Sequence, residues 1–187
     1  MATMTDTRMG DWRLWGGWGL AFLGFPLGGL AGQAVSGGVT TPLEGLLGGA
    51  AAGAVIGLTQ WLVLRGRTTL PAWWIGATAA GMGLGLGASI ALFGNATADA
   101  TLLLRGGVTG AAIGLAQFGL LRTLGTRALI WPPLIALGWA MGWMITRAAG
   151  VDLSPNWPVF GSTGAWGFQL LTGLALAWIM RDSVKSV

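Results

Sequence analysis

Two glutamines, Gln60 and Gln117, stand 57 residues apart, each inside an apolar segment. A buried amide both donates and accepts hydrogen bonds. Each glutamine can therefore join two helices, at on the order of 1 kcal/mol in a membrane, or line a polar site at the centre of the molecule. The sequence leaves both roles open.

Groups with catalytic or metal-binding chemistry are scarce. The sequence has no His, Cys or Tyr, which excludes disulfides, thiolate metal sites and the commonest general base. Hydroxyl groups such as those of Thr59, Thr109 and Ser162 have no neighbouring base, and no carboxylates cluster inside an apolar segment. The sequence therefore predicts no catalytic residue, no metal site and no enzymatic activity.

The composition indicates an integral membrane protein. Hydrophobic residues make up 53% of the chain and charged residues 9%, with a mean hydropathy of +0.69, and a water-soluble surface carries far more charge. Lipid offers the backbone no hydrogen-bond partner, so membrane-spanning segments are expected to be helices. The first segment is too long for a signal-peptide core. Six segments are long enough to cross the bilayer: Leu14–Val35, Leu43–Leu64, Ala72–Phe93, Leu102–Leu121, Leu129–Ile145 and Val159–Met180.

Basic residues predict the orientation of the chain. Two of them, Arg105 and Arg147, lie toward one side of the membrane and eight toward the other. The positive-inside rule then places both termini and the turns Arg65–Pro71 and Arg122–Ala128 in the cytoplasm, as expected for a multi-pass protein of the bacterial inner membrane. The pI of about 11.5 reflects this orientation, because no soluble basic surface for nucleic acid is present. The eight residues are Arg8, Arg13, Arg65, Arg67, Arg122, Arg127, Arg181 and Lys185.

The chain repeats with a period of 57 residues, as the spacing of Gly24, Gly81 and Gly138 shows. Each unit holds two spans, so successive units enter the membrane from the same side and are parallel copies. We therefore expect an all-α bundle of six transmembrane helices, built from three hairpins about a pseudo-threefold axis along the membrane normal. The third unit is expected to have lost the glutamine, with Leu176 breaking the symmetry. The chain is a single integral membrane domain, 1–187, with repeats at about 13–66, 67–123 and 124–183.

Glycines recur four residues apart within these segments. Residues at this spacing share one face of a helix, and a face of small residues lets two backbones approach closely in lipid. We expect helix packing at Gly24, Gly28, Gly49, Gly53, Gly57, Gly81, Gly85, Gly106, Gly110, Gly114, Gly138 and Gly142.

Tryptophan is abundant, with 12 residues, and several lie where interfacial belts form. Trp139 and Trp143 stand beside Gly138 and Gly142 and toward the outer half of their segment. Two interpretations stay open for this pair. The two rings pack in the ordinary way, or they wall a groove for a flat apolar ligand such as a carotenoid or a lipid tail.

Three motifs carry a resemblance to a known group of proteins. They are Gly57–Arg65 (GLTQWLVLR), Gly138–Trp143 (GWAMGW) and Gly173–Arg181 (GLALAWIMR). Together they resemble an uncharacterised group of small bacterial glycine-rich polytopic membrane proteins, over nearly the whole chain. That group has no assigned activity, so the resemblance implies a helical bundle and no particular role.

These observations predict a non-enzymatic structural or accessory subunit. It would pack through its glycine-rich faces against other membrane proteins, such as those of an energy-converting complex, and hold lipid or a carotenoid-like pigment in its aromatic grooves. Its partners would be membrane lipids and membrane protein subunits. The alternative is a small-solute channel or facilitator with a central site lined by Gln60 and Gln117.

Overall fold

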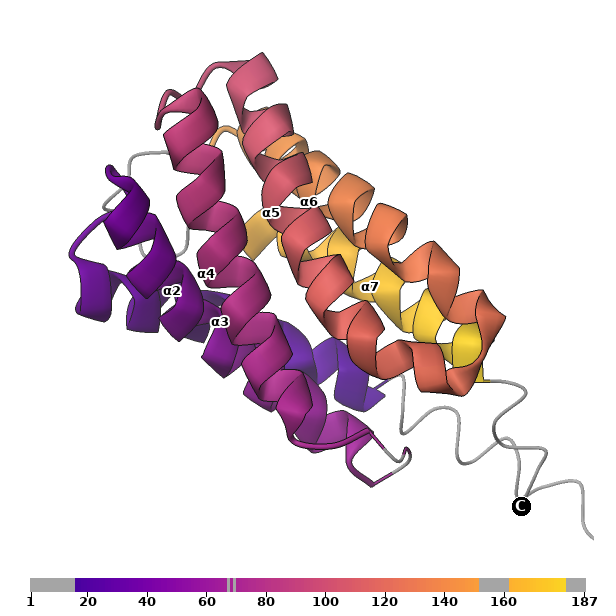
Figure 1. Ribbon diagram of the computed structural model, residues 1–187. Helices are drawn as coiled ribbons and strands as arrows, with labels where there is room; N and C mark the ends of the chain where they lie inside the picture. The colour runs from indigo at the N-terminus through magenta and orange to yellow at the C-terminus, as the bar shows by residue number, and fades with distance from the viewer. Residues whose placement is uncertain (1–15, 67, 69, 152–161, 181–187) are drawn as a thin grey trace, which may run out of the picture.

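A computed structural model describes residues 16–66, 68, 70–151 and 162–180. Every element in these ranges is a helix, and six long helices form a bundle in which each packs against the next along the chain (Figure 1). The first helix, Gly16–Ser36, contains η1 (Ala21–Leu23) and α2 (Gly24–Ser36). After it come α3 (Pro42–Leu64), α4 (Trp73–Phe93), α5 (Asp99–Leu121), η2 (Arg122–Leu124), η3 (Thr126–Ile130), α6 (Trp131–Ala148) and α7 (Ser162–Met180).

Five of the helices are long and apolar enough to cross a membrane: the first helix, α3, α4, α6 together with η3, and α7. The prediction of a multi-pass helical membrane protein is confirmed at this level. Helix α5 has 23 residues, as many as α3, but Arg105 and Gln117 lower its hydropathy and it is not among the five. Residues 159–161 of the last predicted segment lie outside the described residues.

The connections divide the bundle into two ends. At the terminal end lie the start of the first helix, the end of α7, and the turns from α3 to α4 and from α5 to α6 (Figure 1). At the distal end lie the connections from α2 to α3 and from α4 to α5. The basic residues predict that the terminal end is cytoplasmic.

Local sequence signals fix the helix boundaries at the distal end. Helix α3 begins with a capping box, in which the Glu44 amide donates to Thr41 Oγ1 at 3.2 Å and the Thr41 amide donates to Glu44 Oε2 at 3.1 Å. Pro42 occupies the first turn, where a missing amide hydrogen costs nothing. Gly37 and Gly94 end α2 and α4 with φ angles of 70° and 69°, a conformation that glycine adopts without strain.

The first helix tightens into a 3₁₀ turn at η1, an irregularity that the apolar length of the predicted segment does not indicate. Pro26 has no amide hydrogen to donate to the Phe22 carbonyl, and its ring crowds the preceding turn. A short 3₁₀ stretch is a common response to such a break. Thr59 of α3 donates to the Ala21 carbonyl at 3.3 Å, so the irregular turn is attached to the neighbouring helix.

Glycine lies at every contact between consecutive helices. A Cβ added to Gly53 of α3 would lie 2.7 Å from the Thr78 carbonyl oxygen of α4, and one added to Gly110 of α5 would lie 2.5 Å from that of Ile135 of α6. Only glycine allows these backbones to approach so closely. The glycine-rich faces that we expected to meet other proteins are therefore occupied within this chain. All the glycines predicted for packing lie at such contacts: Gly24, Gly28, Gly49, Gly53, Gly57, Gly81, Gly85, Gly106, Gly110, Gly114, Gly138 and Gly142.

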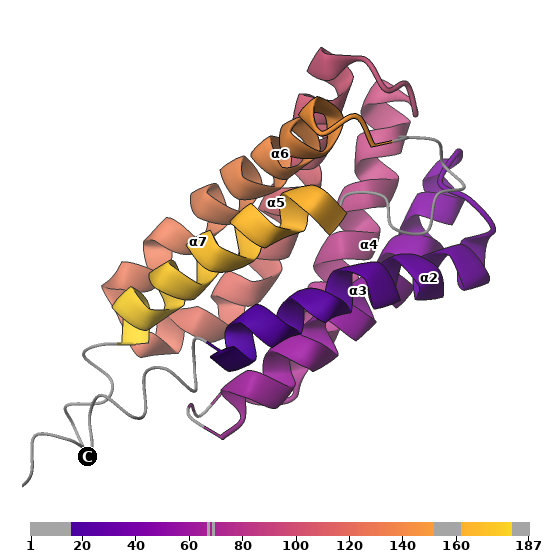
Figure 2. The same cartoon turned by 180° about the vertical axis from the view of Figure 1, so that it is seen from behind.

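The side-chain core fills the terminal half of the bundle. Its members include Leu64, Trp74, Leu121, Trp131 and Ile179, all of which are almost completely buried. The first helix and α7 lie side by side (Figure 2), and their contacts run from Trp18 with Gln169 to Phe22 with Trp166 near the start of α7.

Candidate functional site

Gln60 and Gln117 lie in the terminal half, and each accepts a hydrogen bond from a tryptophan on the next helix. Trp74 Nε1 of α4 donates to Gln60 Oε1 of α3 at 3.2 Å, and Trp131 Nε1 of α6 donates to Gln117 Oε1 of α5 at 2.9 Å. Gln117 Nε2 also donates to Thr78 Oγ1 of α4 at 3.0 Å. Gln117 thus joins three helices, and both buried indoles have the acceptor that a dry environment requires.

A third pair closes the first helix onto α7. Trp18 Nε1 donates to the Gln169 carbonyl oxygen at 2.8 Å, and Gln169 Nε2 donates to the Trp18 carbonyl oxygen at 2.8 Å. The expectation that the third unit contributes no buried glutamine is wrong. Alignment of the third unit with a shift of two residues from the 57-residue period pointed to Leu176, which lies in the core, whereas Gln169 stands seven residues earlier. Gln169 is a polar residue inside an apolar segment, which by itself indicates a buried contact. It does not align with Gln60 and Gln117 at the 57-residue spacing.

The three pairs form a glutamine–tryptophan layer across the bundle. Its members are Trp18, Gln60, Trp74, Gln117, Trp131 and Gln169, all of them buried. The space left at this level is about 10 Å³, at the lower limit for a single water molecule. The structure therefore brings Gln60 and Gln117 to one level, but that level is filled by side chains.

A larger cavity, of about 140 Å³, lies on the distal side of this layer. Every long helix contributes to its wall, and the lining is mostly apolar. A concave, mostly apolar space with few polar groups is the usual form of a small-molecule site. One lining residue from each helix in turn is Phe25, Ile56, Met82, Leu102, Trp139 and Phe168.

Three of these residues form an aromatic cluster: Phe25, Trp139 and Phe168. The ring centroids of Trp139 and Phe168 are 5.3 Å apart with an interplanar angle of 88°, and Phe25 lies 5.9 Å from each of the other two rings. Edge-to-face contacts of this kind are favourable. Phe168 also borders the small space in the glutamine–tryptophan layer, so the cluster forms the floor of the cavity.

The predicted aromatic groove at Trp139 and Trp143 corresponds to this cavity. Both tryptophans line it, together with Gly138 and Gly142. The space lies between the six long helices, all of which line it. Phe25 and Phe168 were missed because an isolated phenylalanine in an apolar segment carries no signal of its own.

One charged residue, Arg105 of α5, is among the described residues that line the cavity. Its Nε atom is buried and has no hydrogen-bond partner. The polar residues on the opposite rim are satisfied locally, since Gln33 donates to the Gly37 carbonyl and Ser36 to the Gly32 carbonyl. The Nε atom of Arg105 is therefore a buried donor of this site that the described residues leave without a partner.

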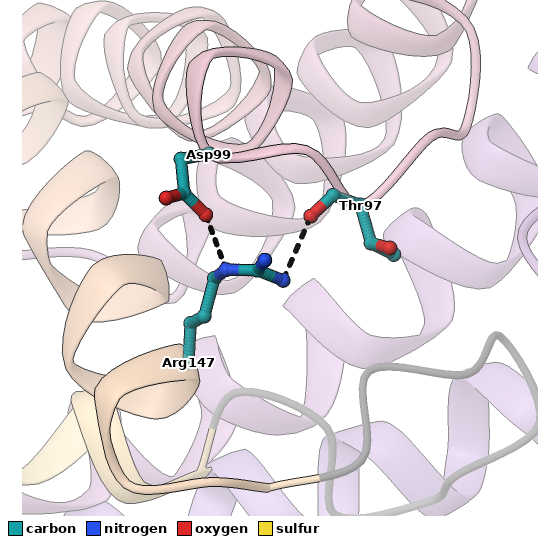
Figure 3. A network of polar contacts seen from close by, with 3 residues as sticks. All are labelled: Thr97, Asp99 and Arg147. Carbon is teal, nitrogen blue, oxygen red and sulfur yellow. Dashed lines mark hydrogen bonds and ion pairs between the residues drawn. The ribbon is translucent and has the colours of Figure 1, made fainter.

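The other arginine predicted for this side, Arg147, is neutralised at the surface. Its guanidinium forms an ion pair with Asp99 and donates to the Thr97 carbonyl oxygen at 3.1 Å (Figure 3). These contacts attach the end of α6 to the start of α5. The Arg147 and Asp99 side chains are 44% and 59% exposed, so this pair lies outside the cavity wall and contributes little to stability.

Within the part of the chain that the structure describes, no group of three or more His, Cys, Asp or Glu residues is arranged to hold a metal ion. The polar groups near the cavity are amides, hydroxyls and one guanidinium. Such groups bind and orient a ligand.

Comparison with known proteins adds no family to this description. No protein-family model, curated protein or solved structure matches the chain. The resemblance to small glycine-rich polytopic proteins therefore stays a prediction.

Proposed function

We propose that this chain is a non-enzymatic membrane subunit that holds an apolar ligand, a lipid tail or the end of a carotenoid-like pigment, in its distal cavity. The observation that carries the proposal is the cavity itself, walled by all six long helices and floored by the aromatic cluster. A close-packed bundle has few voids. A space of this size therefore supports a ligand-binding role.

The volume limits what the cavity holds. An apolar cavity of about 150 Å³ in another protein accommodates benzene, and the cavity here is about 140 Å³. It therefore fits a short stretch of one acyl chain or one ring of a pigment, with the rest of the ligand extending between the helices. A lipid with both chains inside does not fit.

We further propose that the bundle is built from three parallel hairpins about an axis along the membrane normal. The pairs of the glutamine–tryptophan layer support this, because each joins one predicted unit to the next and the last joins the third unit back to the first. The layer and the cavity would then lie one above the other on this axis. The pairs are Trp74 with Gln60, Trp131 with Gln117, and Trp18 with Gln169.

The alternative role as a small-solute facilitator has less support. Its central residues, Gln60 and Gln117, are engaged with Trp74 and Trp131, and the space beside them is about 10 Å³. A solute that entered the cavity would meet a closed layer. The cavity geometry favours holding a ligand over passing one.

A matched pair of variants tests the ligand-binding role. Leu86 lines the cavity from α4, whereas Leu84 of the same helix is 62% exposed on the outer surface. Native mass spectrometry of the purified protein should show a bound small molecule in the wild type and in Leu84→Trp. Leu86→Trp fills the cavity and should lose it.

Two outcomes would overturn this proposal. One is a wild-type protein recovered without any bound molecule from its native membrane. The other is a folded Leu86→Trp variant that retains the same molecule at the same stoichiometry as Leu84→Trp.

A further inference from the structure

Arg105 is partly buried against the cavity, and its Nε atom is fully buried. It lies on α5 with Leu102 three residues before it and Thr109 four residues after it, and all three line the cavity. Gly106 and Gly110 turn instead toward α6. The guanidinium therefore belongs to the stripe of α5 that faces the interior space.

Arg105 is partly buried, and one donor of its guanidinium is not satisfied by the protein. Its Nε is buried with no acceptor, and no described carboxylate pairs with it, since Asp99 pairs with Arg147 and Glu44 caps α3. Burying an unpaired charged donor is costly. Buried polar groups without partners are rare in native proteins and call for a specific explanation, such as an absent ligand.

The position of Arg105 also makes the two ends of the cavity chemically different. It is the seventh residue of α5, which places it about 9 Å along the helix axis from the distal end. The aromatic cluster lies deeper, next to the glutamine–tryptophan layer. The cavity is thus charged toward the distal end and apolar at its floor.

We propose that Arg105 binds the anionic head group of a single-chain amphiphile whose tail lies against Phe25, Trp139 and Phe168. This inference rests on the ligand-binding role proposed above and specifies its ligand. A guanidinium presents a planar fork of donors that matches a carboxylate or a phosphate. The small volume of the cavity selects one chain over two. The ligand would lie with its head toward the distal end.

Binding of three amphiphiles with similar tails tests the charge requirement. Oleate carries a carboxylate, lysophosphatidylglycerol carries a phosphate, and oleyl alcohol is uncharged. Titration of the delipidated protein, followed by native mass spectrometry, should show at least one anion binding about tenfold or more tighter than the alcohol, as a charge-assisted hydrogen bond provides. Tighter oleate identifies a carboxylate ligand, and tighter lysophosphatidylglycerol identifies a phosphate; either result supports the proposal.

The matched variants are Arg105→Leu and Arg147→Leu, which remove one arginine each from the same end of the bundle. Arg105→Leu should lose the preference for anions while binding oleyl alcohol as before, and Arg147→Leu should keep the preference. Arg105→Gln, which is neutral and polar, provides the same readout if the leucine variant does not fold.

The possible failures are distinguishable. Equal binding of all three amphiphiles, or an anion preference that survives the loss of Arg105, overturns the role of this arginine and leaves the apolar site in place. Binding of none of the three overturns the ligand-binding role as well.

Discussion

Single buried polar residues hold the bundle together at the glutamine–tryptophan layer. The Gln117 amide accepts from Trp131 and donates to Thr78, so one side chain joins α4, α5 and α6. Where the hydrophobic effect does not drive helices together, such bonds help to determine which helices are neighbours. This role needs no ligand, and it accounts for both glutamines that the sequence singled out.

Replacement of Gln117 by leucine should therefore destabilise the fold. It leaves the Trp131 indole N–H buried without an acceptor, at a cost of about 1–2 kcal/mol. The free energy of unfolding, measured by steric trapping or SDS titration, checks this value. A double-mutant cycle with Trp131→Phe should give a coupling energy of about 1 kcal/mol. Gln33→Leu is the control, since Gln33 is half-buried at the distal end and donates only to the nearby Gly37 carbonyl.

Zero coupling between the two positions would contradict the structural role. Normal stability in Gln117→Leu together with an altered solute flux would favour the facilitator instead.

The residue scale is also where prediction from sequence was least complete. Gln60 and Gln117 were recognisable because a polar side chain in an apolar segment is conspicuous. The hydrogen bonds that they accept from tryptophan were not recognisable, because these bonds depend on the axial offset between neighbouring helices. Gln169 was missed for the same reason, since it bonds Trp18 at a register that the 57-residue period does not give.

At the scale of the helices, packing depends mainly on the close approach of neighbouring backbones at glycine. The stripe of α3 that contains Gly49, Gly53 and Gly57 meets α4 along its length. Contacts of this kind depend on the absence of a side chain, so a larger residue must separate the two helices. The cost of overpacking in a well-packed interior is about 1–3 kcal/mol.

Gly53→Leu should accordingly destabilise the protein by about 1–3 kcal/mol or more. Gly119→Leu is the matched control, because nothing lies within 4 Å of a Cβ added at that position of α5. Thermal unfolding in detergent compares the two variants. Equal stability of both would show that the glycine contacts do not hold α3 against α4.

The helices themselves were largely predictable. The lengths of the apolar stretches predicted spans at Leu43–Leu64 and Ala72–Phe93, and the structure has helices at Pro42–Leu64 and Trp73–Phe93. The 3₁₀ turn near Pro26 was readable in principle, because a proline inside an apolar segment removes a helical hydrogen bond. Its attachment to Thr59 was not, since that contact depends on tertiary packing.

For the whole molecule, the central feature is the division along the bundle. The terminal half is closed by the core and by the glutamine–tryptophan layer, and the distal half contains the cavity. No local pattern in the sequence predicts this division, because the cavity is lined by residues of all six long helices and depends on how they pack together. Trp139 and Trp143 were the only part of its wall that the sequence indicated.

A density map of the protein purified with its native lipids and reconstituted in nanodiscs tests this account most directly. The account predicts elongated density in the distal cavity, in contact with Arg105 and the aromatic cluster, and continuous side-chain density across the glutamine–tryptophan layer. An empty or collapsed cavity, or an open path past Gln60 and Gln117, would contradict it.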